Sequence, residues 1–161
     1  MSVYSHKISP LIGSGDLLGD LEGKVTLLVN VASKCGLTPQ YSALQQVHSD
    51  LSEKGFSVVG VPCNQFLGQE PGTAEEIHEF CSTSFNVSFP LTEKVDVNGD
   101  ARHELYAALS NVQDGEGYSG DIRWNFEKFV IGRQGNVVAR FHPQVAPDAP
   151  EVLAAIQSAL G

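Results

Sequence analysis

Two apolar runs joined by a helical pattern constrain the fold of this chain more than any other feature. Residues 24–32 (KVTLLVNVA) and 56–61 (FSVVGV) are rich in β-branched side chains and show almost no alternation of polar and apolar residues. Such runs are typical of strands that are buried on both faces. Between them we expect a helix from Thr38 to Lys54, with an apolar stripe of Tyr41, Leu44, Val47 and Leu51. The pattern predicts two parallel strands joined by a crossover helix.

The predicted helices begin and end at residues that commonly cap helices. The expected N-caps are Thr38, Thr73, Asp100 and Asp148. Thr73 and Glu76 have the spacing of a capping box. Gly55 is expected to end the first helix, because glycine readily adopts the left-handed conformation found after helices.

Two further strands are expected in the second half of the chain. Residues 126–131 and 137–141 are joined by residues 132–136, which contain two glycines, and this arrangement predicts a hairpin. The stretch before Gly23 is rich in Gly, Asp and Leu and is expected to hold a short hairpin. Together the elements predict an α/β protein with a central mixed sheet and helices on both faces. A length of 161 residues without repeats or a long linker suits a single domain over residues 1–161.

Charge and hydropathy disfavour several classes of function. The formal net charge is −9, from 10 basic and 19 acidic residues, which disfavours binding to nucleic acid or to anionic membrane surfaces. No stretch approaches the roughly 18 apolar residues of a membrane span, so stable membrane insertion is not expected. Met1–Pro10 lacks the basic and apolar regions of a secretory signal, and we therefore expect a cytoplasmic protein.

Three cysteines, Cys35, Cys63 and Cys81, carry the main chemical signal. An odd number without a Cys-x-x-Cys pair or zinc-like spacing argues against a disulfide scaffold and a metal site, and no cofactor is expected. Cys35 lies between the first buried strand and the following helix, at the sheet edge where α/β proteins bind ligands. A cysteine just before a helix N-terminus is favoured as a thiolate, and Lys34 adds positive charge nearby. Position alone also allows a second interpretation of Cys35, as a small buried cysteine in a turn without a chemical role.

Amide and indole groups are expected near the same edge of the sheet. Gln65 and Gln69 follow the second buried strand, and Trp124 and Asn125 precede a later one. These groups donate hydrogen bonds without changing charge, and fixed donors of this kind can stabilise a thiolate and a developing oxyanion. For a lone tryptophan beside an asparagine, simple packing is the alternative interpretation.

Three segments, VNVASKCGLTPQY, VPCNQFLGQEPG and WNFEKFVIGRQG, resemble the signature blocks of the glutathione peroxidase family. They occur in the family's order, and the similarity extends from about Lys24 to Leu160. The resemblance implies a thioredoxin-like fold and the reduction of hydroperoxides to alcohols and water. It also implies a catalytic set, which consists of Cys35, Gln69, Trp124 and Asn125. The family more often has glycine where Leu67 stands, which leaves open whether Gln65 or Gln69 faces the sulfur.

Cys81 has two interpretations. Ala74, Ile77 and Cys81 share one helical face, so periodicity by itself indicates a core residue. The resemblance is to the non-selenium, thioredoxin-dependent branch of the family, and it implies that Cys81 resolves a sulfenic acid on Cys35. The two Cα atoms would then have to come within about 7 Å, so the second helix is expected to unwind on oxidation. The family assigns no role to Cys63, which we expect to be an inert buried thiol.

The segment 110–123 and the charges near the motifs bear on partners. Tetrameric, glutathione-using relatives carry a longer insertion here, so its absence implies a monomer with an open site for bulky and lipid hydroperoxides. No cluster of Arg and Lys near the motifs is available to bind the carboxylates of glutathione. Thioredoxin is therefore the expected reductant, with glutathione as the alternative.

Three rival functions fit parts of the sequence. A general thiol–disulfide oxidoreductase would need a second cysteine where Thr38 stands. A peroxide sensor that relays oxidation to a partner protein would use the same chemistry at Cys35. A binding module that kept the fold and lost activity is disfavoured by the intact set of Cys35, Gln69, Trp124 and Asn125.

Overall fold

The computed structural model describes residues 2–161 and contains a four-stranded mixed sheet. The strands are β1 (Val25–Val31), β2 (Phe56–Pro62), β3 (Lys128–Ile131) and β4 (Val137–Phe141), in the spatial order β2-β1-β3-β4. β1 and β2 run parallel, with Val25 opposite Phe56 and Val31 opposite Pro62. β3 pairs antiparallel with both β1 and β4. The predicted mixed sheet, its parallel pair and its C-terminal hairpin are confirmed.

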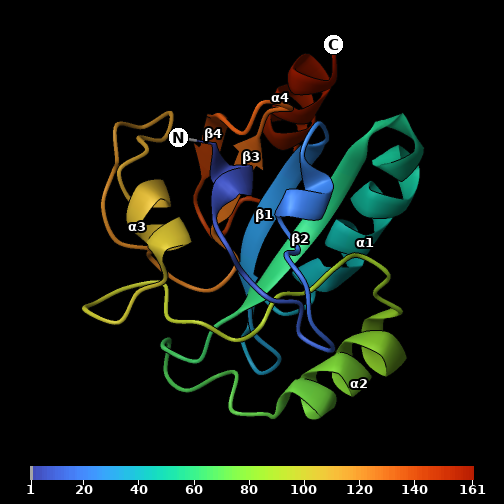
Figure 1. The fold of residues 1–161 in the computed structure, drawn as a ribbon, viewed down its shortest axis with the longest axis vertical. Coiled ribbons are helices and arrows are strands. Elements are labelled where there is room, and N and C mark those ends of the chain that lie inside the picture. The colour runs from blue at the N-terminus through green and yellow to red at the C-terminus, as the bar shows by residue number, and fades with distance from the viewer. Residues whose placement is uncertain (1) are drawn as a thin grey trace.

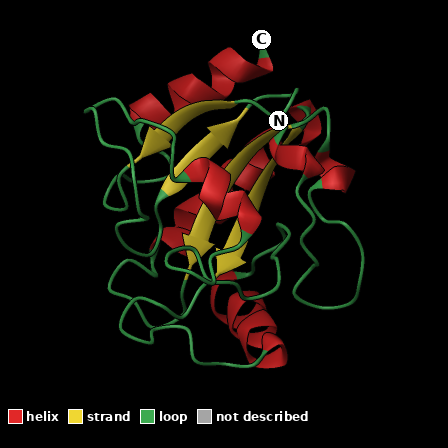
Figure 2. Ribbon diagram, turned by 60° about the vertical axis from the view of Figure 1, so that its left-hand side comes forward, coloured by secondary structure: helices red, strands yellow, loops and turns green. Residues whose placement is uncertain are grey.

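Within the described residues, four α-helices lie beside this sheet or beyond its end (Figures 1 and 2). They are α1 (Gln40–Leu51), α2 (Ala74–Phe85), α3 (Glu104–Leu109) and α4 (Pro150–Leu160). Short 3-10 turns lie at Val3–Ser5, Gly19–Leu21 and Ser52–Lys54, and the last of these extends α1 towards Gly55. Figure 1 shows α1 lying along the sheet, whereas α2 lies at the lower end of the molecule, away from its strands.

The sheet separates two apolar clusters, which explains why β1 carries no polar alternation. Val25, Leu27, Val29 and Val31 pack in a cluster with buried residues of α1 and α4. Leu28 packs in the other cluster, with α3 and the N-terminal segment. Because all of β1 is buried, both of its faces carry apolar residues. Helices therefore cover both faces of the sheet, as expected.

Two of the predicted helix ends, at Gly55 and at Thr73, are correct. Gly55 has φ 85° and ends the first helix, and the Thr73–Glu76 capping box is formed. Thr38, Asp100 and Asp148 are wrong as caps. α1 begins after Pro39 and α4 after Ala149, both without a side-chain cap, and α3 is capped by the His103 ring, which accepts from the N–H of Leu105. α1 and α4 therefore begin without a side-chain cap, whereas the local cap of α3 is His103 instead of Asp100.

Two other expectations differ from the structure. No hairpin forms between residue 2 and Gly23; this stretch makes two 3-10 turns and a single bridge between Pro10 and Thr92. Proline lacks the N–H that a strand ladder needs, and Gly13 and Gly15 have positive φ, so this stretch turns instead of pairing. β3 begins at Lys128 rather than at Phe126, because Phe126 has φ 70° and leaves the strand conformation. From residue 2 to residue 161, the structure has no helix with the length and apolar character needed to cross a bilayer.

Candidate active site

Cys35 lies in the loop that joins β1 to α1, at the carboxyl end of β1. Its side chain is 8% exposed and lines a pocket of about 370 Å³. The other lining residues are Gly36, Leu37, Trp124, His142, Pro143 and Gln144. Trp124, distant in sequence, is therefore brought to the same pocket as Cys35, as the sequence predicted. The low exposure of Cys35 means that a substrate must enter this pocket to meet the sulfur.

Backbone geometry around Cys35 supplies a donor to its sulfur. The N–H of Leu37 donates a hydrogen bond to Cys35 Sγ at 3.3 Å. The N–H of Cys35 donates to Thr38 Oγ1 at 2.9 Å, and that hydroxyl donates to the carbonyl of Ala32 at 2.8 Å. Thr38 therefore fixes the turn that presents the sulfur instead of capping α1. The sulfur therefore accepts a backbone hydrogen bond from within its own loop.

The two candidate glutamines face different parts of the molecule. Asn125 Nδ2 donates to Gln69 Oε1 at 3.0 Å, and the carbonyl of Gln69 accepts from the N–H of Lys34 at 3.0 Å. Gln65 Oε1 instead accepts from the N–H groups of Val97 at 2.7 Å and Asn98 at 3.0 Å. Gln69, rather than Gln65, therefore joins Asn125 and the Cys35 loop.

The direct donor to the sulfur differs from the sequence expectation. Within residues 2–161, no side chain of Gln69, Trp124 or Asn125 donates a hydrogen bond to Cys35 Sγ, and the Leu37 N–H does so instead. Local sequence did not single out Leu37, because any residue except proline offers a backbone N–H at that position. Of the three, Trp124 lines the Cys35 pocket, whereas Asn125 and Gln69 bond to each other and the backbone of Leu37 contacts the sulfur.

Trp124 and Asn125 are held by a strained turn that two buried polar residues stabilise. Asn30 Nδ2 donates to the carbonyl of Trp124 at 3.0 Å, and the N–H of Phe126 donates to the carbonyl of Asn30 at 2.7 Å. Lys128 Nζ donates to the carbonyls of Phe126 at 2.5 Å and Pro143 at 3.0 Å. The sequence analysis missed both Asn30 and Lys128. Their signal was a polar residue inside an apolar strand run, which is unusual unless the residue is paired.

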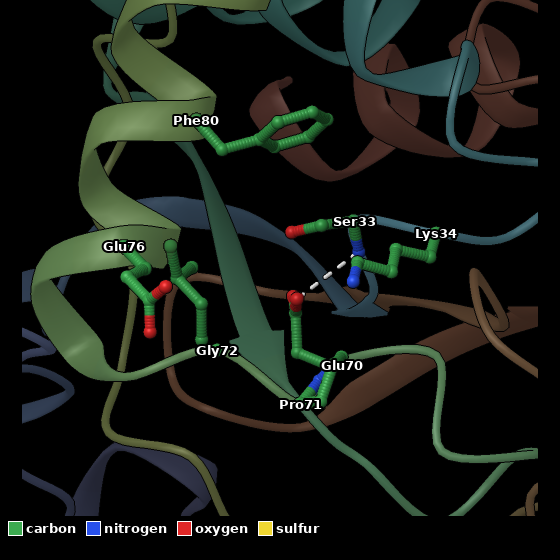
Figure 3. A pocket seen from close by; sticks show the side chains of 8 residues that line it. Ser33, Lys34, Glu70, Pro71, Gly72, Glu76 and Phe80 are labelled. Atoms are coloured by element: carbon green, nitrogen blue, oxygen red, sulfur yellow. Dashed lines mark hydrogen bonds between the residues drawn. The ribbon is translucent and has the colours of Figure 1, made fainter.

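A buried carboxylate, Glu70, was also missed. Its side chain is fully buried, and Oε1 accepts from the N–H of Ser33 at 3.1 Å (Figure 3). The N–H of Glu70 donates to Asn64 Oδ1 at 2.9 Å. Burial raises the pKa of the Glu70 carboxyl, and its hydrogen bonds with Ser33 partly offset this effect. Glu70 therefore links the loop after β2 to the loop that carries Cys35.

Cys81 and Cys63 are buried free thiols, as is Cys35. Cys81 is 1% exposed on the core face of α2, where periodicity predicted it. Burial raises the pKa of the Cys81 thiol to about 11; the Tyr41 hydroxyl opposes this shift, and the negative charge of Glu70 adds to it. Burial also raises the pKa of Cys63. Within the described chain, residues 2–161, no three His, Cys, Asp or Glu side chains lie close enough together to hold a metal ion.

The sheet order and the β1–α1–β2 crossover define a protein of the thioredoxin-like fold. The family model for glutathione peroxidase matches residues 3–110. The chain belongs to the glutathione peroxidase family and is therefore a peroxidase, an enzyme of the oxidoreductase class.

Similar proteins cover nearly all of the chain. The hydroperoxy fatty acid reductase Gpx2 of Synechocystis sp. is 58% identical over 138 residues, which cover 86% of each chain. The thioredoxin/glutathione peroxidase BtuE of Escherichia coli is 43% identical over 178 aligned positions, which cover 99% of this chain and 97% of the relative. The crystal structure of T. cruzi GPX1 aligns with a TM-score of 0.79 at 31% identity, covering 100% of this chain and 97% of the other.

Proposed function

We propose that Cys35 is the residue that attacks the hydroperoxide. Its thiolate would attack the terminal oxygen of ROOH, forming an S–O bond while the O–O bond breaks and an alkoxide leaves. The product is a sulfenic acid on Cys35. The single observation that carries this proposal is the Leu37 N–H, which donates to the sulfur of a cysteine lining a pocket.

Gln69 would stabilise the oxygen that leaves. The Oε1 atom of Gln69 accepts a hydrogen bond from Asn125, which fixes the orientation of the Gln69 amide. Within residues 2–161 the Nε2 group of Gln69 makes no hydrogen bond to the protein, so its N–H groups are free to donate to the substrate. Together with the Trp124 indole, it would supply neutral, fixed donors where negative charge develops. The alkoxide then takes a proton from solvent and leaves as the alcohol.

The pocket suits hydroperoxides that carry an apolar group. Leu37, Trp124 and Pro143 give its wall a largely apolar character beside Cys35. The Synechocystis relative is named for reducing hydroperoxy fatty acids. We therefore propose that the enzyme accepts hydrogen peroxide together with organic and lipid hydroperoxides.

Cys81 would resolve the sulfenic acid and form a disulfide with Cys35. Unwinding α2 would release the core contacts of Ile77, Phe80 and Phe85, and local opening of this kind is accessible in a short element. The disulfide formed after unwinding would be accessible to an external reductant. The Escherichia coli relative is named for both thioredoxin and glutathione. We propose thioredoxin, since the residues lining the Cys35 pocket include no Arg or Lys to bind the carboxylates of glutathione.

Two further proposals follow from the same residues. A cytoplasmic location suits three free thiols, because reducing compartments keep cysteines unpaired. A monomer suits the short segment 110–123, in which Asp114 and Arg123 form an ion pair at 3.0 Å within the chain.

Coupled turnover assays test the proposed function. NADPH consumption with cumene hydroperoxide would be followed with thioredoxin and thioredoxin reductase, and separately with glutathione and glutathione reductase. Cys35→Ser should abolish turnover in both assays. Cys81→Ser should abolish turnover with thioredoxin while one equivalent of peroxide is still consumed. Cys63→Ser, a buried thiol outside the site, is the matched control and should retain activity.

Different results would reject different parts of the proposal. Peroxide consumption by Cys35→Ser would reject Cys35 as the attacking residue. Full thioredoxin-linked turnover by Cys81→Ser would reject the resolving role. Faster wild-type turnover with glutathione than with thioredoxin would identify glutathione, instead of thioredoxin, as the reductant. Slow turnover with both, accompanied by a mixed disulfide with another protein, would favour a peroxide sensor.

A further inference from the structure

A second pocket lies on the α2 side of the loop that carries Cys35. Its volume is about 230 Å³. Ser33 and Lys34 line it on one side and Ile77 and Phe80 of α2 on the other, with Glu70 between them. Figure 3 shows the Glu70 carboxyl pointing into the space between α2 and the Ser33–Lys34 segment. The pocket therefore separates the two segments that carry Cys35 and Cys81.

We propose that Glu70 transfers the proton when the Cys35–Cys81 disulfide closes. Its carboxylate takes the proton from the Cys81 thiol and then gives it to the hydroxide that leaves the Cys35 sulfenic acid. This inference rests on the proposed resolving role of Cys81. It assigns a chemical function to a residue that the peroxide step does not use.

The first support is the unpaired oxygen of Glu70. Oε1 accepts from the Ser33 N–H, but Oε2 is buried and has no hydrogen-bond partner within residues 2–161. A buried polar atom without a partner is costly and needs a reason. A carboxylate oxygen held free beside α2 is available to a proton donor that arrives only when the helix opens.

The second support is the set of charges around Glu70. Burial raises the pKa of this carboxyl, and its hydrogen bonds with Ser33 and the positive charges of Lys94 and Lys34 oppose part of the rise. Glu76 faces the same pocket from α2, but the Thr73 N–H bonds and lowers the pKa of its carboxyl, so it is the weaker base. Tyr41, on α1, has a pKa raised well above its ordinary value and stays neutral. Of the two carboxylates that line this pocket, Glu70 is therefore the stronger base.

The third support is the protonation state of Cys81. Its thiol has a pKa of about 11 in the folded helix and is protonated at neutral pH. A thiol must lose its proton before it attacks sulfur, because the thiolate is the nucleophile. The negative charge of Glu70 contributes to this raised pKa, so the two groups lie within electrostatic range before the helix opens. A base on this side of the Cys35 loop can accept the proton that the Cys81 thiol must lose.

The step balances in atoms and electrons. Cys81–SH gives its proton to the Glu70 carboxylate, and the resulting thiolate attacks the sulfur of Cys35–SOH. An S–S bond forms as the S–O bond breaks, so Cys81 sulfur is oxidised and Cys35 sulfur is reduced. The departing hydroxide takes the proton from the Glu70 carboxylic acid and leaves as water. Glu70 ends in its starting state.

Rapid-mixing experiments on the reduced protein separate this step from the peroxide step. One equivalent of hydrogen peroxide would be added, samples would be quenched with an alkylating agent, and sulfenic acid and disulfide would be counted by mass. Glu70→Gln keeps the shape of the side chain and an acceptor for Ser33. Its peroxide step should match wild type within about twofold, while disulfide formation should slow by about 10²-fold. Glu75→Gln removes an exposed carboxylate from the first turn of α2 and is the matched control, with both steps unchanged.

Two further readouts distinguish proton transfer from a structural role. The wild-type rate of disulfide formation should rise with pH as Glu70 loses its proton, and Glu70→Gln should lack this inflection. In Glu70→Ala, added formate should restore part of the rate of disulfide formation, because a small carboxylate can replace the missing group. These effects are not expected if Glu70 only holds the Ser33 loop in place.

Several outcomes would overturn the proposal. Disulfide formation by Glu70→Gln at the wild-type rate would do so, and so would an equal slowing of both steps. Failure of formate to restore Glu70→Ala, with the pH inflection kept in Glu70→Gln, would also reject it. Wild-type protein that forms no Cys35–Cys81 disulfide would reject the resolving role of Cys81 itself, and that result is seen before any Glu70 variant is compared.

Discussion

Asn125 Nδ2 donates a hydrogen bond to Gln69 Oε1 at 3.0 Å and so joins two loops that are distant in the sequence. Asn125 is completely buried and has no freedom to turn towards solvent. Because its amide fixes the acceptor end of Gln69, the donor end is left for a substrate. In the proposed mechanism, Asn125 would therefore act on the reaction through Gln69.

Gln69→Ala should slow the peroxide step and leave the fold intact. Removing one fixed donor to a developing oxyanion typically costs about 10²–10³-fold in rate. Gln65→Ala is a matched control from the same loop, because Gln65 binds the backbone of Val97 and Asn98 instead. We expect Gln65→Ala to lower the melting temperature and to keep the rate of Cys35 oxidation, measured by stopped-flow fluorescence of Trp124. The opposite pattern would assign the role to Gln65.

Thr73→Ala should accelerate formation of the Cys35–Cys81 disulfide. The Thr73–Glu76 capping box stabilises α2, and losing an N-cap costs about 1 kcal/mol. If unwinding precedes disulfide formation, this loss raises the open population and the rate by about fivefold. Thr73→Ser keeps the cap and should behave as wild type. Hydrogen exchange of α2 amides measures the opening, and unchanged disulfide kinetics with faster exchange would contradict the need for unwinding.

Lys128→Met should disturb the Trp124–Asn125 turn. The substitution leaves the carbonyls of Phe126 and Pro143 without this donor, so we expect a loss of stability of about 1–3 kcal/mol. Displacement of Trp124 should shift its fluorescence emission and slow the peroxide step by up to about 10²-fold. Lys54→Met, at an exposed lysine, is the control. A folded Lys128→Met protein with wild-type emission and rate would show that Lys128 has no positioning role.

Lys128 should also make stability depend on pH. Burial lowers the pKa of its ammonium to about 7, whereas the ordinary value is 10.5. Between these values the unfolded chain binds more protons than the folded one, so the free energy of unfolding should rise as pH increases from about 7, by at most about 1.4 kcal/mol per pH unit. Below pH 7 both states hold the proton and this dependence should vanish. Urea unfolding at several pH values should show the slope in wild type and its absence in Lys128→Met; equal slopes would contradict the lowered pKa.

The sequence by itself determined the elements whose signals are local or periodic. The apolar runs of β1 and β2 specify strands buried on both faces, since a strand between two helical layers needs no polar alternation. The capping box at Thr73 and the turn at Gly55 depend on residues a few positions apart, and both form as predicted. The three motif blocks were enough to relate the chain to one family. Through that resemblance they pointed to Cys35, Gln69, Trp124 and Asn125 as the catalytic set.

Only the tertiary structure decided how those blocks meet. The resemblance assigned Gln69 but left Gln65 open. In the structure the backbone of Val97–Asn98 binds Gln65, whereas the amide of Asn125 binds Gln69. The roles of Lys128 and Glu70 depend on carbonyls and N–H groups supplied by other elements, which no local pattern contains. The physical reason is that a buried polar group is defined by its partners, and those partners come together only when the sheet and its loops are assembled.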